Sequence, residues 1–389
     1  MKTVTLSSFS RHFFNFGAML CICFTVGGFA ATAGAAGSLK KDAGERIHLA
    51  IFTSAGSSGF WPLVEDFSSA VAEDLNIELK TYRYADPIAM MKLVHSVLDD
   101  PAKRPDGILF HNHKHQAPNV LKAVENAGVP ALMFNAGPTE KDDIGVPRER
   151  FKQYIGLLTP NDYKAGFDLA TILIEAAERK DMRGSDGKIH IIALEGNRNS
   201  GPAIARKNGL KDVVAAREDV VIDQFFDTHW RREKASSAFV AARARYSDAK
   251  VFWAASDSMA LGALDGAEMS GAQPGIDFIS GGIDLLPSIQ PLVHDGRLAA
   301  SIGAHYTEAA WAVVLMYDYL SGCDFIDLPF QNIKTTMLTI TEGSEPLIPG
   351  NSDEAFSAWS ESHDFRSLSR CLNPKTKTYD FNAGTFFGK

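Results

Sequence analysis

Three aromatic residues stand where the sequence could bind a ring-shaped ligand. Phe60 and Trp61 follow a segment of small residues, and Trp230 occurs later in the chain beside a histidine. Aromatic rings can cover the apolar C–H faces of a sugar or a similar polyol. Arg206 and Asp284 carry groups that can bind hydroxyls which would otherwise be buried without partners. The combination indicates a small, neutral, polyhydroxylated ligand.

Most of the polar candidates follow a run of β-branched or aromatic residues that predicts a strand. Ligands of open parallel sheets bind outside the carboxyl ends of the strands. The predicted ligand-binding residues at these positions are Phe60, Trp61, Asn135, Trp230, Asp257 and Asp284, with His111 and Ser256 as further candidates, and a family resemblance adds Arg206 and, as a further candidate, His305.

Each candidate also has a structural alternative. Phe60 and Trp230 could be core residues, since aromatic side chains are more often packed in a core than turned toward a ligand. Asp257 is expected to be a helix N-cap whether or not it also contacts ligand. Arg206 could instead pair with a carboxylate, and Asp284 could be a turn residue.

The three histidines of segment 111–115 raise the alternative of a metal site, because imidazole is a common zinc ligand. No HxxxH helix, cysteine pair or supporting acidic motif accompanies them. We therefore expect these residues to form a polar rim, with His111 or His113 in contact with ligand, and we expect no metal.

Motifs of the common enzyme classes are missing from the sequence. Neither GxGxxG nor GxxxxGK[ST] follows a predicted strand, and the segment 56–59 lacks the GxSxG spacing of a nucleophile elbow. No pair of carboxylates is marked as a general acid and base. The sequence therefore predicts a binding protein that is not an enzyme and needs no cofactor.

Length and composition fit a folded protein of two domains. The chain has 389 residues, of which 45% are hydrophobic and 22% charged, and domains average roughly 100 to 200 residues. Its net charge is -8 and it contains no basic run, so nucleic acid is not an expected partner. A mean hydropathy of -0.08 argues against a multi-span membrane protein.

Residues 1–36 have the pattern of a secretory signal. Lys2 and Arg11 precede an uncharged apolar stretch, and small residues with A-x-A cleavage options follow at 30–36. An uncleaved anchor is the alternative, but the apolar stretch is short for a membrane span of about 20 residues. We expect cleavage between Ala33 and Ala36, without lipid attachment.

Cleavage would remove Cys21 and Cys23 and leave Cys323 and Cys371. In an oxidising compartment this pair could form a disulfide that ties the C-terminal tail to the body. Two unpaired thiols are an equal alternative, because the sequence does not report the distance between their Cα atoms.

From Ile47 onward, short strand-like runs alternate with amphipathic helical stretches. Such alternation predicts parallel strands joined by right-handed crossovers, which is a doubly wound α/β fold. A polar stretch without clear periodicity, from Gly137 to Pro160, interrupts the pattern and suggests two lobes. The segment 344–389 is expected to be an irregular tail.

The predicted strands are 47–53, 77–83, 107–111, 131–135, 188–194, 220–226, 251–255, 278–281 and 298–303. The predicted helices are 61–75, 87–98, 118–127, 163–178, 203–216, 231–246, 258–270 and 308–320.

Seven segments between Ile47 and Thr341 resemble, in the right order, the type I periplasmic binding proteins. This family of ribose- and galactose-binding receptors shares its fold with the ligand-binding part of LacI-type repressors. The segments are Ser58–Trp61, Asp106–Leu109, Gly128–Pro130, Arg206–Leu210, Asp257–Ala263, Gly282–Asp284 and Asp295–Ile302.

The resemblance implies two Rossmann-like lobes that are joined by a three-strand hinge and close around the ligand. The N-terminal lobe would comprise 46–158 plus 305–331, and the C-terminal lobe 159–304 plus 332–343. It also implies that Phe60 and Trp61 stack on one face of the ligand and that Trp230 reaches it from the other lobe. The implied polar contacts are Asn135, Arg206, Asp257 and Asp284.

The sequence departs from the sugar receptors at three places. Asn135 and Ala136 replace a usual Asp-Arg pair, Ser256 replaces an Asn, and Ala304, with His305 beside it, replaces a Gln. A standard pentose or hexose pocket is therefore not implied. Asn135, Trp61 and Arg206 are similar to residues of the autoinducer-2 receptor, but Ala304 and Ile283 lack that receptor's second arginine and tryptophan.

The function implied by the resemblance is that of a periplasmic solute-binding protein. It would act as a monomer, capture a sugar-like ligand and deliver it to the inner-membrane permease of an ABC importer. The alternative is a sensory receptor whose closed form docks on a membrane sensor kinase. A metal-scavenging receptor would need the histidine run as its site. A repressor is not expected, because the segment before Ile47 is a signal sequence and not a DNA-binding helix-turn-helix.

Overall fold

The structure is a computed structural model that describes residues 46–56, 59–345, 347, 355, 358–359 and 362–387. The predicted signal segment, with Cys21 and Cys23, lies outside these residues, so cleavage remains a prediction. Within the described ranges, no helix has the length and apolar character needed to cross a membrane.

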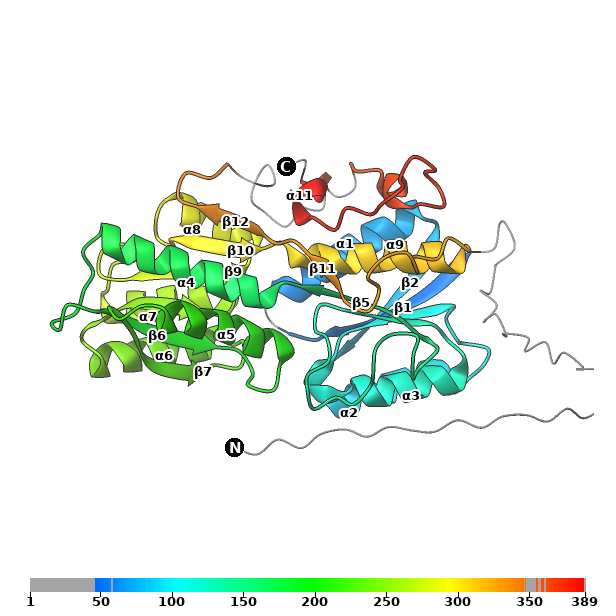
Figure 1. Cartoon of the computed structure of the whole chain (residues 1–389), viewed down its shortest axis with the longest axis horizontal. Coiled ribbons are helices and arrows are strands. Elements are labelled where there is room, and N and C mark those ends of the chain that lie inside the picture. The colour runs from blue at the N-terminus through cyan, green and yellow to red at the C-terminus, as the bar shows by residue number, and fades with distance from the viewer. Residues whose placement is uncertain are drawn as a thin grey trace, which may run out of the picture. The chain divides into compact units, whose positions relative to one another are not determined.

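The first sheet has six parallel strands in the order β11-β5-β4-β3-β1-β2. Figure 1 labels β11, β5, β1 and β2 of this sheet. Its strands are β1 (Ile47–Ser54), β2 (Ile77–Tyr84), β3 (Gly107–Phe110), β4 (Ala131–Phe134), β5 (Tyr154–Pro160) and β11 (Ile333–Thr335). Its helices are α1 (Phe60–Asp74), α2 (Pro87–Leu98), α3 (Ala117–Ala127) and α9 (Glu308–Leu320).

Strand β1 shows why both faces of this sheet are covered. Successive side chains of a strand point to opposite faces. Leu49 and Ile51 belong to the core that contains α1 and α9, whereas Ala50 and Phe52 belong to the core that contains α2 and α3. Each apolar residue from Leu49 to Phe52 therefore has a partner layer, as expected for a parallel strand buried on both faces.

The second sheet also has six strands, in the order β12-β10-β9-β8-β6-β7, with only β12 antiparallel to its neighbour. Its strands are β6 (Ile189–Glu195), β7 (Val220–Asp227), β8 (Ala249–Ala254), β9 (Ile279–Asp284), β10 (Ala300–Gly303) and β12 (Leu338–Thr341). Its helices are α4 (Asp162–Arg179), α5 (Gly201–Ala215), α6 (Arg232–Arg245), α7 (Asp257–Ser270) and α8 (Gln290–His294).

Helices α4 and α5 pack with their backbones in close approach, and two glycines permit it. A Cβ atom on Gly166 would lie 2.0 Å from the carbonyl oxygen of Arg206, and one on Gly209 would lie 2.2 Å from that of Tyr163. Any larger residue would push the helices apart. The close approach brings Arg206 of α5 beside Asp162, the first residue of α4.

All the predicted strands and helices are present, with ends shifted by a few residues, and the predicted α/β fold of two doubly wound lobes is confirmed. The expectation of an irregular stretch up to Pro160 is wrong at its end. Strand β5 occupies residues 154–160 there, buried along its whole length. Its sequence, YIGLLTP, is too short and too uniformly apolar to show a period, which is typical of a fully buried strand.

The chain passes from one sheet to the other three times. It crosses after β5, at the 3-10 turn η3 (His305–Thr307), and between β11 and β12. The exact lobe boundaries remain a prediction. Strand β11, however, is paired with β5 of the first sheet, although the predicted boundary after residue 331 assigns it to the C-terminal lobe.

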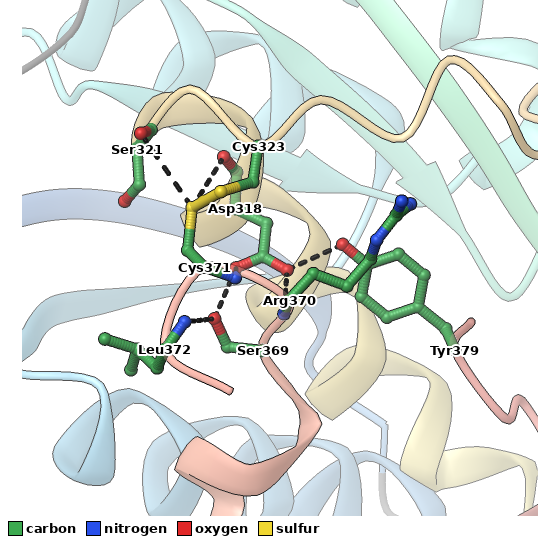
Figure 2. Close-up of a disulfide and its surroundings, with 8 residues drawn as sticks. All are labelled: Asp318, Ser321, Cys323, Ser369, Arg370, Cys371, Leu372 and Tyr379. Atoms are coloured by element: carbon green, nitrogen blue, oxygen red, sulfur yellow. Dashed lines mark hydrogen bonds between the residues drawn. A yellow bond between two sulfur atoms is a disulfide. The ribbon is translucent and has the colours of Figure 1, made fainter. Parts of the chain in front are cut away.

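The structure joins Cys323 to Cys371 in a disulfide with Cα atoms 5.7 Å apart (Figure 2). This decides between the two alternatives that the sequence left open. A short 3-10 turn η4 (Phe365–Leu368) precedes Cys371, and one helical turn α11 (Ala383–Phe386) follows it.

Candidate functional site

A cavity of about 780 Å³ is lined by residues that follow strands of both sheets. Its volume lies within the range of roughly 300 to 1,000 Å³ of small-molecule sites. The lining brings together nine of the ten residues proposed from the sequence: Phe60, Trp61, His111, Asn135, Arg206, Trp230, Ser256, Asp284 and His305.

The aromatic wall on the side of the first sheet is built from α1 and the segment after β3. The ring of Trp61 lies 4.4 Å from that of His111 at an angle of 30°, and it meets Phe60 edge-on at 5.4 Å. Phe60 is buried and its ring lies 4.7 Å from that of His305. Trp61 is only half-buried. Phe60 therefore supports the wall, and Trp61 is the ring better placed to stack on a ligand.

His111 is fixed from behind by Tyr84, whose hydroxyl lies 2.5 Å from its Nε2 atom. Burial lowers the pKa of His111 well below its usual range, so the ring is neutral at pH 7. A neutral imidazole packed on Trp61 adds no charge to this wall. That suits an uncharged ligand surface.

Trp230 forms the wall on the side of the second sheet. Its backbone is left-handed, with φ of 65°, and its indole lies so close to Gly196 that a Cβ atom there would come within 2.2 Å of the ring. The guanidinium carbon of Arg206 lies 5.6 Å from the centre of the Trp230 ring. The missing side chain of Gly196 thus makes room for this indole.

Arg206 is the centre of a buried group that we call the Arg206 cluster, with Asp162, Asp284 and His305. Its Nε donates to Oδ1 of Asp162 at 2.7 Å, and its Nη1 lies 3.5 Å from Oδ1 of Asp284. Its Nη2 donates to Nε2 of His305 at 3.1 Å. Because a guanidinium can only donate, the accepting Nε2 carries no proton, and the proton of the neutral ring is on Nδ1.

Burial governs the charge of the Arg206 cluster. It raises the pKa of Asp162 and of Asp284, although the Arg206 guanidinium acts in the opposite direction on both. Burial also lowers the pKa of His305 well below its usual range. Two carboxyl groups thus compete for one cation in a dry environment, and a further negative charge would be disfavoured. This part of the cavity therefore suits a neutral ligand.

Asp257 is the one proposed residue missing from the described lining of the cavity. It is fully buried, and its carboxylate accepts hydrogen bonds from Ser301 Oγ at 2.7 Å and from the Leu286 N–H at 2.9 Å. The expectation that it is a helix N-cap is also wrong. Ser256 caps α7, accepting from the Met259 N–H. Asp257 supports the segment that follows β9, the strand that ends at Asp284.

Backbone conformation at the strand ends turns several side chains toward the cavity. Asn135, His229, Trp230 and Asp284 all have positive φ angles and all line it. Such conformations cost energy for residues other than glycine and are concentrated at functional sites. These four positions therefore combine the backbone conformations and the residue types that are typical of a binding site.

The family model described as "Periplasmic binding protein domain" matches residues 49–324. The chain belongs to this family.

Curated relatives of this periplasmic binding protein are distant. It is 23% identical over 186 residues to the galactofuranose-binding protein YtfQ of Escherichia coli, a match that spans 47% of this chain and 54% of that protein. It is 25% identical over 289 residues to the D-galactose/methyl-galactoside binding periplasmic protein MglB of Haemophilus influenzae, covering 65% and 84% of the two chains.

Solved structures have the same fold. A periplasmic sugar-binding protein from Pseudomonas fluorescens matches with a TM-score of 0.74 at 22% identity, covering 88% of this chain and 99% of the other. A galactofuranose binding protein matches with a TM-score of 0.65 at 19% identity, covering 76% and 94%.

Sequence reasoning about this binding protein missed Asp162, which orients Arg206, and His229, which lines the cavity beside Trp230. Asp162 lies two residues after the end of the unrecognised strand β5, so its position near a strand end was hidden. Of the histidine run, His111 and His113 line the cavity. His115 instead lies 3.1 Å from the carboxylate of Asp142.

Proposed function

We propose that this protein captures a neutral, sugar-like ligand in the periplasm and delivers it to the permease of an ABC importer. The observation that carries the proposal is the cavity itself. It places the indoles of Trp61 and Trp230, from opposite sheets, around the same space as the buried Arg206 cluster.

The two kinds of wall suit the two kinds of sugar surface. Indoles cover apolar C–H faces, and the fixed donors and acceptors around Arg206 bind hydroxyls that lose water on entry. A ligand that touches both sheets would favour a closed arrangement of the lobes, because it binds that state more tightly than the open one. A permease can then recognise the closed form.

The relatives support the sugar class. The two curated relatives are named for galactofuranose and for D-galactose or methyl-galactoside, and one structural neighbour was solved with D-allose. The departures at Asn135, Ser256 and Ala304 leave the preferred ring form and stereochemistry to be measured.

A thermal-shift screen of the oxidised protein tests the proposal. The probes are D-galactose, L-arabinose, D-allose, the anionic sugar D-glucuronate and Zn²⁺. We expect a neutral sugar to raise Tm by mass action, since a ligand at 100 times its Kd adds about 2.7 kcal/mol of stability. A shift with Zn²⁺ that a chelator removes, or with D-glucuronate alone, would contradict the proposal.

The variant Trp230→Ala should lose the shift while its own Tm without ligand stays close to that of the parent. Tyr246→Ala is a matched control, because Tyr246 is a half-buried aromatic at the far end of α6 and does not line the cavity. If both variants respond to the sugar as the parent does, the cavity is not the binding site.

A further inference from the structure

The segment 362–387, which we call the C-terminal segment, lies beyond the residues matched by the family model and has a dense set of contacts with the body. These contacts centre on Asp318 of α9, a residue of the body that is fully buried. The carboxylate of Asp318 accepts hydrogen bonds from the hydroxyl of Tyr379 at 2.6 Å, the N–H of Arg370 at 2.8 Å, the hydroxyl of Ser369 and the N–H of Cys371 (Figure 2). The disulfide to Cys323 lies beside these contacts.

Aromatic side chains extend this attachment toward the hinge. Phe381 and Phe386 lie 5.1 and 5.4 Å from the ring of Trp311 in α9, and Phe386 lies 5.8 Å from the ring of Phe67 in α1. The ring of Phe67 is itself 5.4 Å from that of Tyr306. Because Tyr306 belongs to η3, this aromatic group joins the C-terminal segment to the second crossing of the chain.

The C-terminal segment also holds the third crossing by its backbone. The N–H of Thr336 donates to the carbonyl of Phe381 at 3.2 Å, and the N–H of Ala383 donates to the carbonyl of Thr336 at 3.1 Å. Thr336 is the first residue after β11, and β12 begins two residues later. Both backbone groups of this crossing residue are therefore bound to a segment that is itself fixed to the first sheet's helices.

We propose that the C-terminal segment restrains rotation between the sheets at the hinge. The disulfide Cys323–Cys371 and the Asp318 contacts hold this segment in position. With Thr336 held against residues 381–383, rotation between the sheets at the third crossing is confined to the residues that follow it. The consequence for ligand affinity rests on the proposed function, whereas the restraint itself does not.

The restrained crossings are connected to the cavity. His305 of η3 accepts a hydrogen bond from Arg206 at 3.1 Å. The neighbouring Glu308 carboxylate accepts from the Thr335 hydroxyl, which joins the second crossing to the third. A hinge that is already ordered needs less ordering when the ligand binds, so the restraint raises affinity.

Two variants release the restraint by different routes. The double variant Cys323→Ser with Cys371→Ser removes the covalent tie. Ala383→Pro keeps that tie and removes the N–H that donates to Thr336. Ala383 is the first residue of α11, where proline is tolerated, and Asn382 before it already has the extended conformation that proline requires (φ -79°, ψ 125°). Lys375→Ala is the control, since Lys375 is an exposed residue of the same segment.

Hydrogen exchange of the ligand-free protein, followed by mass spectrometry, measures the restraint without any ligand. We expect peptides that cover residues 333–341 to exchange at least tenfold faster in both variants, with β6 and β8 unchanged and with Lys375→Ala like the parent. Unchanged exchange at 333–341 in Ala383→Pro would overturn the proposal, whether or not the double serine variant folds.

Affinity is measured on the same proteins with the sugars D-galactose, L-arabinose and D-allose. For any of these that binds the parent, we expect Kd to rise at least threefold in Ala383→Pro. Faster exchange with an unchanged Kd would overturn the claim about affinity and leave the restraint supported. If none of the sugars binds the parent, the proposed sugar class fails while the exchange result still decides the restraint.

Discussion

The Arg206 cluster and the contacts of Asp318 are both buried, but they use their hydrogen-bonding groups differently. At Asp318, each carboxylate oxygen accepts two hydrogen bonds, all from the C-terminal segment. In the Arg206 cluster, two carboxyl groups compete for one guanidinium, and Nδ1 of His305 is buried without a hydrogen-bond partner among the described residues. A carboxylate whose hydrogen-bonding capacity is filled by protein donors fixes a segment in place. A cluster that keeps an unsatisfied polar group beside a cavity is instead suited to binding a ligand.

Removing the cation should have the largest effect, because it leaves buried carboxyl groups uncompensated. We expect Arg206→Ala to lower the free energy of unfolding by about 3 to 5 kcal/mol, the usual cost of breaking a buried ion pair. Urea denaturation at pH 7 measures it. Arg231→Ala, at an exposed position that also lines the cavity, is the control and should change stability by less than about 0.5 kcal/mol.

Two single groups, His305 of the Arg206 cluster and Asp318, should change stability with pH in opposite directions. The pKa of His305 is lowered by burial, so below about pH 6.5 the unfolded chain binds a proton that the folded protein does not, and stability falls as pH falls. The pKa of Asp318 is raised by burial, so this carboxyl stabilises the fold more as pH falls and less as pH rises through its raised pKa.

His305→Gln isolates the first of these effects, since the amide oxygen can still accept from Arg206. Between pH 7.5 and 5.0 we expect the variant to lose about 2 kcal/mol less stability than the parent, at up to about 1.4 kcal/mol per pH unit below 6.5. Denaturation curves at the two pH values measure the difference. Identical losses in the two proteins would mean that His305 is not held neutral by the fold.

A smaller change tests whether sugar binding depends on the position of the Trp230 ring. In Gly196→Ala the new methyl group would overlap the indole of Trp230, with contacts of 2.2 Å, and would displace the ring from the cavity. We expect sugar affinity to fall about tenfold, equivalent to about 1.4 kcal/mol. Gly201→Ala is a matched control, because a Cβ atom there meets nothing closer than 3.6 Å. Calorimetry should find Kd unchanged in the control.

The smallest effect is expected at Asp318, because so many donors share its carboxylate. Tyr379→Phe removes one donor of the four and should cost about 1 kcal/mol of stability, the net worth of one hydrogen bond, with no change in sugar affinity. Thermal denaturation measures the first quantity and calorimetry the second. A loss as large as that of Arg206→Ala would show that this cluster, too, depends on a single contact.

Sequence reasoning reached the candidate site for a physical reason that applies to Trp61, Asn135 and Asp284 alike. Each follows a recognisable strand, and the carboxyl ends of parallel strands meet at one edge of a sheet. Their roles as ligand contacts remain predictions. The same reasoning assigned Asp257 to the cavity because its position after β8 is equivalent, but the fold turns that carboxylate inward, toward Ser301 and Leu286.

Nine of the twelve described strands, the two-lobe α/β fold and nine residues of the cavity lining follow from the sequence, because hydrophobic periodicity and strand-end position are local properties. The tertiary structure alone decided the pairing of Arg206 with Asp162, the fit of Trp230 against Gly196 and the attachment of residues 362–387 to the hinge. These contacts join segments far apart in the chain, and their geometry depends on how closely helices and loops approach once packed. No local pattern of residues records that distance.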